Sequence, residues 1–157
     1  MGDRPPPRWL PLGAGALAVG GRPGKRSYPG LERSGCTAIL SLLCEEEGAL
    51  RLRDEALARG WDWRWLPLRG ATPPAAEHDA RYRAELEEHL AAIEAGARVY
   101  LHCAAGLHRT GMIAAALLLL AEGPDVDLEA RIHELRPVTA NELRADRVAW
   151  ARRVTAR

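Results

Sequence analysis

The sequence lacks phenylalanine altogether and contains a single lysine, Lys25, so arginine supplies almost all of its positive charge. Lysine and arginine together number 22 and aspartate and glutamate 21, which leaves a formal net charge of +1 at pH 7. A chain with so little net charge has no overall field that would attract nucleic acid or an acidic membrane surface. Any recognition of anions must therefore be local to one site.

Cysteine is also scarce, since the chain has only Cys36, Cys44 and Cys103. An odd and sparse set argues against the disulfide scaffold of a secreted domain and favours a reducing compartment. The apolar run 112–121 has about half the span that a membrane helix needs. The five histidines and three cysteines show no spacing typical of zinc sites. We therefore expect a cytoplasmic protein without membrane contact, metal or organic cofactor.

The length of 157 residues fits one compact domain. We predict a flexible proline-rich arm over residues 1–11 and the domain over residues 12–157. Apolar runs and alternating patterns predict strands at 15–20, 36–43, 61–68 and 98–101. Helical periodicity predicts helices at 50–59, 75–95, 110–121, 127–135 and 140–154. This alternation predicts an α/β fold, a single layered domain with a mostly parallel sheet of four to five strands flanked by helices.

Segment 102–111 reads His-Cys-Ala-Ala-Gly-Leu-His-Arg-Thr-Gly and is predicted to join a strand to a buried helix. Such a loop offers an anion unpaired backbone N–H groups and the positive end of the helix dipole. Gly106 permits the backbone angle that turns neighbouring amides inward, and Arg109 presents a planar fork suited to two phosphate oxygens. The sequence therefore predicts a phosphate-binding loop formed by Ala104, Ala105, Gly106, Leu107, His108 and Arg109.

The same donors act on Cys103, because helix N-termini and nearby cations lower a cysteine pKa from about 8.5 to roughly 3.5–7.5. We expect a thiolate that attacks phosphorus and forms a phosphocysteine, which water hydrolyses in a second step. Thr110 is predicted to donate a hydrogen bond to the sulfur, and His102 to hold the loop through its ring nitrogens. His108 either shapes access of the substrate or points to solvent.

These residues resemble the active-site signature of the protein tyrosine and dual-specificity phosphatase superfamily, His-Cys-x-x-Gly-x-x-Arg-Ser/Thr-Gly, at every fixed position. A weaker resemblance to small dual-specificity phosphatases spans about residues 12–154. It rests on the strand that ends at Leu43 before a run of glutamates, the proline-rich loop after Leu66, and Arg136-Pro137 before the last helix. The resemblance implies catalysis by Cys103, Arg109 and Thr110.

One part of the family pattern is missing, namely an Asp on a proline-rich loop that protonates the leaving oxygen. Here segment 67–74 reads Pro-Leu-Arg-Gly-Ala-Thr-Pro-Pro, and Gly70 stands where the acid is expected. Asp79 is the first candidate to replace it, ahead of Glu77 and His78. The alternative is that Asp79 merely complements the dipole of the helix that it begins. The missing acid favours substrates such as anhydrides, whose leaving group departs without a proton.

In the lipid-phosphatase branch of this superfamily, a cysteine in a similar Leu-Cys-x-Glu context forms a disulfide with the nucleophile. By that resemblance, a reversible Cys44–Cys103 bond is a hypothesis for redox protection of the nucleophile. The alternative is that Cys44 is an ordinary core thiol, and Cys36 is expected only to pack in the core.

The leading functional hypothesis is a protein tyrosine phosphatase, with dual specificity as an extension, acting on a phosphorylated protein or a small phosphomonoester. The first alternative is the same chemistry on a nucleotide or an RNA 5′ phosphate without an Asp acid, the only way in which nucleic acid enters as a partner. A rhodanese-like sulfur transferase is a second alternative, but it leaves His102, Arg109 and Thr110 unexplained. A non-catalytic phosphate-binding module is a third, which Gly70 keeps open.

Overall fold

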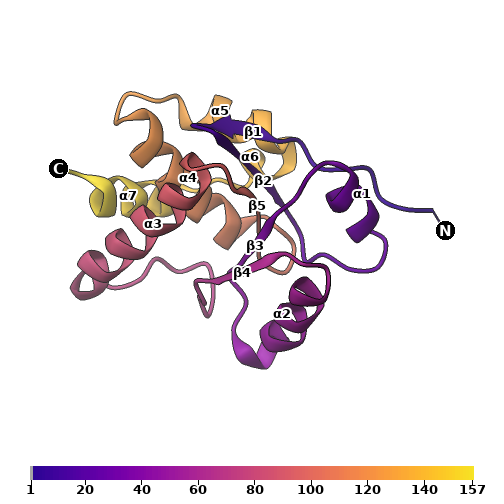
Figure 1. The fold of residues 1–157 in the computed structure, drawn as a ribbon. Helices are drawn as coiled ribbons and strands as arrows, with labels where there is room; N and C mark the ends of the chain where they lie inside the picture. Colours follow the sequence, from indigo (N-terminus) through magenta and orange to yellow (C-terminus); the bar gives the residue numbers. More distant parts are fainter. Residues whose placement is uncertain (1) are drawn as a thin grey trace.

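The computed structural model describes residues 2–157, which form one five-stranded sheet with helices on both faces (Figure 1). The strands follow the order β1-β2-β5-β3-β4 across the sheet. Their bounds are β1 Leu10–Leu12, β2 Gly15–Gly20, β3 Ala38–Ser41, β4 Asp62–Trp65 and β5 Arg98–His102. Only β1 pairs antiparallel, with β2, and the three other pairings are parallel. The predicted α/β class and mostly parallel sheet are confirmed.

The helices divide between the two faces of the sheet, with α1 and α2 on one side and α3 to α7 on the other (Figure 1). Their bounds are α1 Tyr28–Arg33, η1 Glu45–Glu47, α2 Ala49–Ala58, η2 Ala76–His78, α3 Asp79–Glu94, α4 His108–Glu122, α5 Leu128–Leu135, α6 Pro137–Asn141 and α7 Ala145–Thr155. Successive strand residues alternate between the two cores: Val99 and Leu101 of β5 pack under α4, whereas Tyr100 packs under α1 and α2. Both faces are covered at β2, β3 and β5, so these three strands are mostly apolar and buried.

Helix α4 lies at the centre of the larger core, where it contacts β2, β5, α3, α5, α6 and α7. All ten of its residues from Thr110 to Leu119 are buried, which explains a sequence that is apolar on every side. Within residues 2–157, no helix has the length and apolar character needed to cross a bilayer.

The structure differs from the sequence prediction mainly at short elements. Helix α1 lies between the strands predicted at 15–20 and 36–43, where no helix was predicted, and Pro29 occupies its first turn, a position that tolerates proline. The helix predicted over 140–154 is two helices, α6 and α7, because the chain turns at Glu142 and packs Leu143 against the core. Strand β1 starts at Leu10, two residues before the predicted domain boundary, and reverses through Gly13 at φ +61°.

Residues 2–9, which belong to the predicted arm, contact the body of the domain. The backbone N–H of Arg4 donates to the carbonyl of Arg26 at 2.8 Å, and Arg26 Nε donates to the carbonyl of Gly2 at 3.0 Å. Pro6 lies against Gly30 of α1. Met1, the first residue of that arm, lies outside the described residues.

The parallel strands place four connecting segments at one edge of the sheet. The carboxyl ends of β2, β3, β4 and β5 meet there, which is where open α/β sheets bind their ligands. The segment 102–111 follows β5 at this edge, the three glutamates of η1 follow β3, and the proline-rich segment 67–74 follows β4. Side chains of these segments therefore lie at the same edge of the sheet as Cys103.

A truncation inside α4 tests the central position of this helix. Leu117→Ala is expected to lower the free energy of unfolding by about 2–5 kcal/mol, because the leucine is 0% exposed and its removal leaves a cavity. Leu57→Ala is the control, since Leu57 is 54% exposed and its change should stay within about 0.5 kcal/mol. Urea denaturation measures both, and equal losses would contradict the packing described for α4.

Candidate active site

The segment between β5 and α4, residues 103–109, is here called the Cys103 loop. Its carbonyl oxygens are held from outside: Arg22 N–H donates to the carbonyl of Ala104 at 2.9 Å, and Thr139 Oγ1 donates to that of Gly106 at 2.6 Å. Arg136 Nη1 also donates to the carbonyls of Ala105 and Gly106, each at 3.0 Å. With these oxygens engaged, the loop is free to direct its N–H groups towards the sulfur and an anion above it.

Gly106 is required for this conformation of the loop. Its φ of +72° lies in the left-handed region, and a Cβ there would lie 2.2 Å from the carbonyl carbon and oxygen of Gly20. A side chain would therefore be both strained and sterically excluded. The close approach of the loop to the end of β2 explains why the predicted phosphate loop has glycine at this position.

Cys103 is 4% exposed, and its sulfur receives three hydrogen bonds from its own loop and helix. Thr110 Oγ1 donates to Sγ at 3.1 Å, and the backbone N–H groups of Gly106 and Thr110 also donate to it. Burial raises the pKa of the thiol, but these donors and the charge of Arg109 outweigh it, so that the pKa of Cys103 is below its usual value. The predicted contact between Thr110 and the sulfur is present.

Arg109 is held in place by Glu47, the last residue of η1. Nη1 donates to Oε1 at 2.8 Å and Nη2 to Oε2 at 3.0 Å, which is a bidentate pair. Nη1 also donates to the carbonyl of Leu68 at 2.8 Å. The hydrogen bonds from Arg109 lower the pKa of Glu47 to about 2, and those to Glu47 raise the pKa of Arg109, so both groups stay charged.

The pairing with Glu47 leaves part of the guanidinium free for a ligand. A guanidinium has five N–H groups, of which three are used by Glu47 and Leu68. The Nε–H and one Nη2–H of Arg109 donate to no atom of residues 2–157. These two remaining N–H groups are enough to bind two oxygens of a tetrahedral anion.

The role of Glu47 was not predicted from the sequence. The run of glutamates after Leu43 served there only as part of the family resemblance. The available signal was topological, because an acidic group directly after β3 must lie at the same sheet edge as the loop after β5. What the sequence could not show is which of Glu45, Glu46 and Glu47 faces the site. Glu46 instead pairs with the exposed Arg69 at 2.8 Å.

One family model matches the part of the sequence that contains this loop. Residues 70–130, which include all of segment 102–111, match the model of the tyrosine phosphatase family. The predicted resemblance to the tyrosine phosphatases is confirmed. No curated protein sequence matches the chain at a significant level.

Solved structures of tyrosine-phosphatase-like enzymes share the fold. The kinase associated phosphatase, in a form whose catalytic cysteine is replaced by serine, superposes with a TM-score of 0.74 at 18% identity over 98% of each chain. The core catalytic domain of the PP-IP phosphatase SIW14 from S. cerevisiae has a TM-score of 0.60 at 19% identity, covering 95% of this chain and 86% of that one. TpbA from P. aeruginosa, in complex with pTyr, has a TM-score of 0.58 at 20% identity, covering 88% and 86%. The chain thus has a tyrosine-phosphatase fold.

His102 of this phosphatase-like chain is completely buried directly before Cys103. Its Nδ1 lies 2.9 Å from the carbonyl of Cys103, and its ring stacks with that of Tyr100 at 6.1 Å between centroids. Burial lowers the pKa of His102 to about 4, so the ring is neutral and Nδ1–H donates to the carbonyl. Nε2 has no partner among the described residues. One of the expected ring hydrogen bonds is therefore present.

The structure does not bring Asp79 to the Cys103 loop. Its carboxylate accepts from Arg153 of α7 at 2.7 and 3.2 Å, which lowers its pKa, and in residues 2–157 no hydrogen bond joins it to the loop. A carboxylate committed to an arginine is poorly suited to donate a proton. Glu77 and His78 pair with each other at 3.6 Å.

Segment 67–74 provides no acid either. A Cβ placed on Gly70 would meet no described atom within 4 Å, so this position lies in the open. Leu68 is buried, and its carbonyl serves Arg109. The segment that carries the acid in the resembled family thus contributes only a hydrogen-bond acceptor here.

Cys44 is a buried free thiol next to η1, and its backbone N–H donates to Glu47 Oε1 at 3.0 Å. Burial and the nearby Glu46 and Glu47 raise the pKa of Cys44. Cys44 follows β3 and Cys103 follows β5, and these strands are parallel neighbours, so the two thiols lie at the same edge of the sheet. A disulfide between them stays a prediction, and Cys36 is buried in the smaller core.

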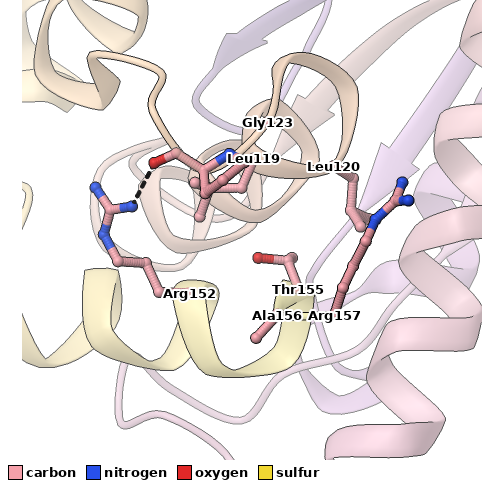
Figure 2. A pocket seen from close by; sticks show the side chains of 8 residues that line it. Leu119, Leu120, Gly123, Arg152, Thr155, Ala156 and Arg157 are labelled. Carbon is pink, nitrogen blue, oxygen red and sulfur yellow. Dashed lines mark hydrogen bonds between the residues drawn. The ribbon is translucent and has the colours of Figure 1, made fainter.

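A separate hollow of about 520 Å³ lies between α4 and α7 (Figure 2). Leu119, Leu120 and Gly123 line it, and Arg152 Nη1 donates across its rim to the carbonyl of Pro124 at 3.0 Å. It lies at the carboxyl end of α4, whereas the Cys103 loop precedes the amino end, so it takes no part in the site. Within residues 2–157, no three His, Cys, Asp or Glu side chains are arranged to hold a metal ion.

Thr110→Val tests the hydrogen bond to the sulfur. Valine has nearly the same shape in this fully buried position but no hydroxyl, so the pKa of Cys103 should rise towards its usual value. The rate of alkylation by iodoacetamide, measured against pH, is expected to shift to higher pH. Thr110→Ser should retain the profile of the wild type, and an unchanged profile in Thr110→Val would show that the hydroxyl has no such effect.

Glu47→Ala tests whether the carboxylate holds Arg109. With the guanidinium no longer fixed, binding of tungstate, a tetrahedral oxyanion, is expected to weaken about tenfold, the value of one charge-assisted hydrogen bond. Glu46→Ala removes the same charge from the same segment without touching Arg109 and is the matched control. Isothermal titration calorimetry measures both affinities. Tighter binding in Glu47→Ala would mean that Glu47 competes with the anion.

Proposed function

We propose that this chain is a cysteine-dependent phosphomonoester hydrolase that removes phosphate from phosphotyrosine, and also from phosphoserine or phosphothreonine. One observation carries the proposal. Several hydrogen-bond donors converge on the sulfur of Cys103, and the guanidinium of Arg109 retains N–H groups that can bind an anion. Cys103 accepts from the Thr110 hydroxyl and from the amides of Gly106 and Thr110, while Arg109 keeps two unused N–H groups. A buried structural thiol has no need for such an arrangement.

The proposed reaction has two steps that use the same groups. In the first, the thiolate of Cys103 attacks phosphorus, the S–P bond forms and the bond to the leaving oxygen breaks. Arg109 and the loop amides bind the three equatorial oxygens as charge shifts among them. In the second, water attacks the phosphocysteine, inorganic phosphate departs, and the thiolate leaves with stabilisation from the Thr110 hydroxyl.

The choice of phosphotyrosine is supported by the tyrosine phosphatase family match and by the structural similarity to TpbA, which is in complex with pTyr. A second substrate class has its own support, because neither segment 67–74 nor Asp79 offers a proton near the sulfur. A phosphoanhydride, such as a nucleoside triphosphate or an RNA 5′ triphosphate, has a leaving group that departs without a proton. SIW14, whose fold this chain shares, is a PP-IP phosphatase.

Cys103→Ser is the decisive variant. Hydrolysis of p-nitrophenyl phosphate and of a phosphotyrosine peptide is expected to fall by at least about 10³-fold, since serine lacks the acidity of the thiol. The variant should still bind tungstate, because the amides and Arg109 remain. Cys36→Ser, at a thiol outside the loop, is the control and should keep most of the activity.

Several outcomes would contradict this function. Equal turnover by wild type and Cys103→Ser would exclude the phosphocysteine route. Tungstate binding without hydrolysis of any phosphomonoester or anhydride would indicate a non-catalytic phosphate-binding module. Turnover of thiosulfate would indicate the rhodanese-like alternative.

A further inference from the structure

The Cys103 loop carries an imidazole at its exposed rim. His108 is the first residue of α4, adjacent to Arg109, and its side chain is 45% exposed, whereas Cys103 and Thr110 are buried. Its Nε2 lies 3.3 Å from Glu142 Oε2, across 34 residues of sequence. This contact holds the ring against the segment that follows α6.

Glu142 belongs to the segment that supports the loop from outside. It follows α6, whose Thr139 donates to the carbonyl of Gly106. The segment that carries Glu142 is therefore hydrogen-bonded to the loop that carries His108. Two arginines hold Glu142 in turn: Arg144 Nη2 lies 3.4 Å from Oε2, and Arg147 Nη1 donates to its backbone carbonyl at 3.0 Å. The carboxylate is therefore anchored and able to orient the ring.

We propose that His108, oriented by Glu142, is the proton donor to the leaving oxygen; this rests on the function proposed above. Nε2 contacts the Glu142 carboxylate, and Nδ1, which makes no hydrogen bond to residues 2–157, is the nitrogen proposed to donate to the substrate, as in a base that a carboxylate orients. Histidine is also the side chain that most often serves as a general acid or base. Neither Asp79 nor segment 67–74 is placed to act as the proton donor.

The protons balance over the two steps. As the S–P bond forms and the P–O bond breaks, the imidazolium of His108 gives its free N–H proton to the leaving oxygen, which departs as a neutral alcohol or phenol. The neutral ring then accepts a proton from the attacking water while the S–P bond breaks. Phosphate leaves, the Cys103 thiolate is restored and His108 is again an imidazolium.

The test compares aryl phosphates whose leaving groups differ in pKa, from p-nitrophenyl to phenyl phosphate. In His108→Gln, kcat/KM for phenyl phosphate is expected to fall by about 10²–10⁴-fold, and that for p-nitrophenyl phosphate by much less, because nitrophenolate departs without a proton. His133→Gln, at an exposed histidine of α5 outside the site, is the control. Glu142→Gln should show the same selectivity to a smaller degree, together with an altered pH profile.

A merely structural role of His108 predicts a different pattern. Thermal unfolding and tungstate affinity, measured on the same proteins, should match the wild type in His108→Gln if the ring acts only on the proton. A uniform loss on all leaving groups, no loss at all, or a selective loss in Asp79→Asn instead would overturn the inference. Failure of the proposed function itself would be recognised separately, as wild-type hydrolysis that does not depend on Cys103.

Discussion

The ion pair between Glu47 and Arg109 is the interaction on which the site depends most. It joins the segment after β3 to the amino end of α4, and the carbonyl of Leu68 adds the segment after β4 to the same guanidinium. The arginine side chain is 12% exposed, so the pair lies where solvent screens it little. Because three N–H groups are committed to the protein, the direction of the remaining two is determined before any ligand arrives. This preorganisation is what electrostatic stabilisation of a transition state requires.

Two opposing effects meet at Cys103, and their balance explains the composition of the loop. Burial at 4% exposure disfavours a thiolate, whereas the Thr110 hydroxyl, two amides and Arg109 favour it. The donors prevail because the chain itself holds them near the sulfur: Cys103, Gly106 and Thr110 lie within eight consecutive residues of one strand–loop–helix unit. The loop can hold this shape only with glycine at 106, where a Cβ would overlap the backbone of Gly20. The chemistry of the thiol is thus tied to the packing of β2 against β5.

The residues considered as proton donors are placed differently from the Cys103 loop. The segment after β4, which supplies the acid in the resembled family, here gives a buried leucine whose carbonyl supports Arg109. Asp79 is drawn towards α7 by Arg153, so its charge stabilises the contact between two helices. The imidazole of His108, held by Glu142, is the titratable group nearest in sequence to Arg109. Phosphate capture and proton transfer would then share a single loop.

The sequence by itself was sufficient for what depends on local order. It predicted the α/β class, strand β2, the position of α2 within one residue, and the loop that follows β5, because period-two and helical patterns and a nearly contiguous signature encode these features. It was less accurate for α1, β1 and the break between α6 and α7, where short segments are stabilised by packing of residues such as Leu143 rather than by a repeating pattern.

Only the tertiary structure shows which charged side chains pair across large separations in sequence. Glu47 and Arg109 are separated by 62 residues, Asp79 and Arg153 by 74, and His108 and Glu142 by 34. From sequence, each of these side chains had several equally plausible partners, since an exposed carboxylate pairs with whichever cation the fold places beside it. The selection of Glu47 over Glu45 and Glu46, and the removal of Asp79 from the site, follow from how β3 ends and how α7 packs on α3. The proposed nucleophile is therefore identified by the local sequence, and the residues that hold its loop and Arg109 are identified by the fold.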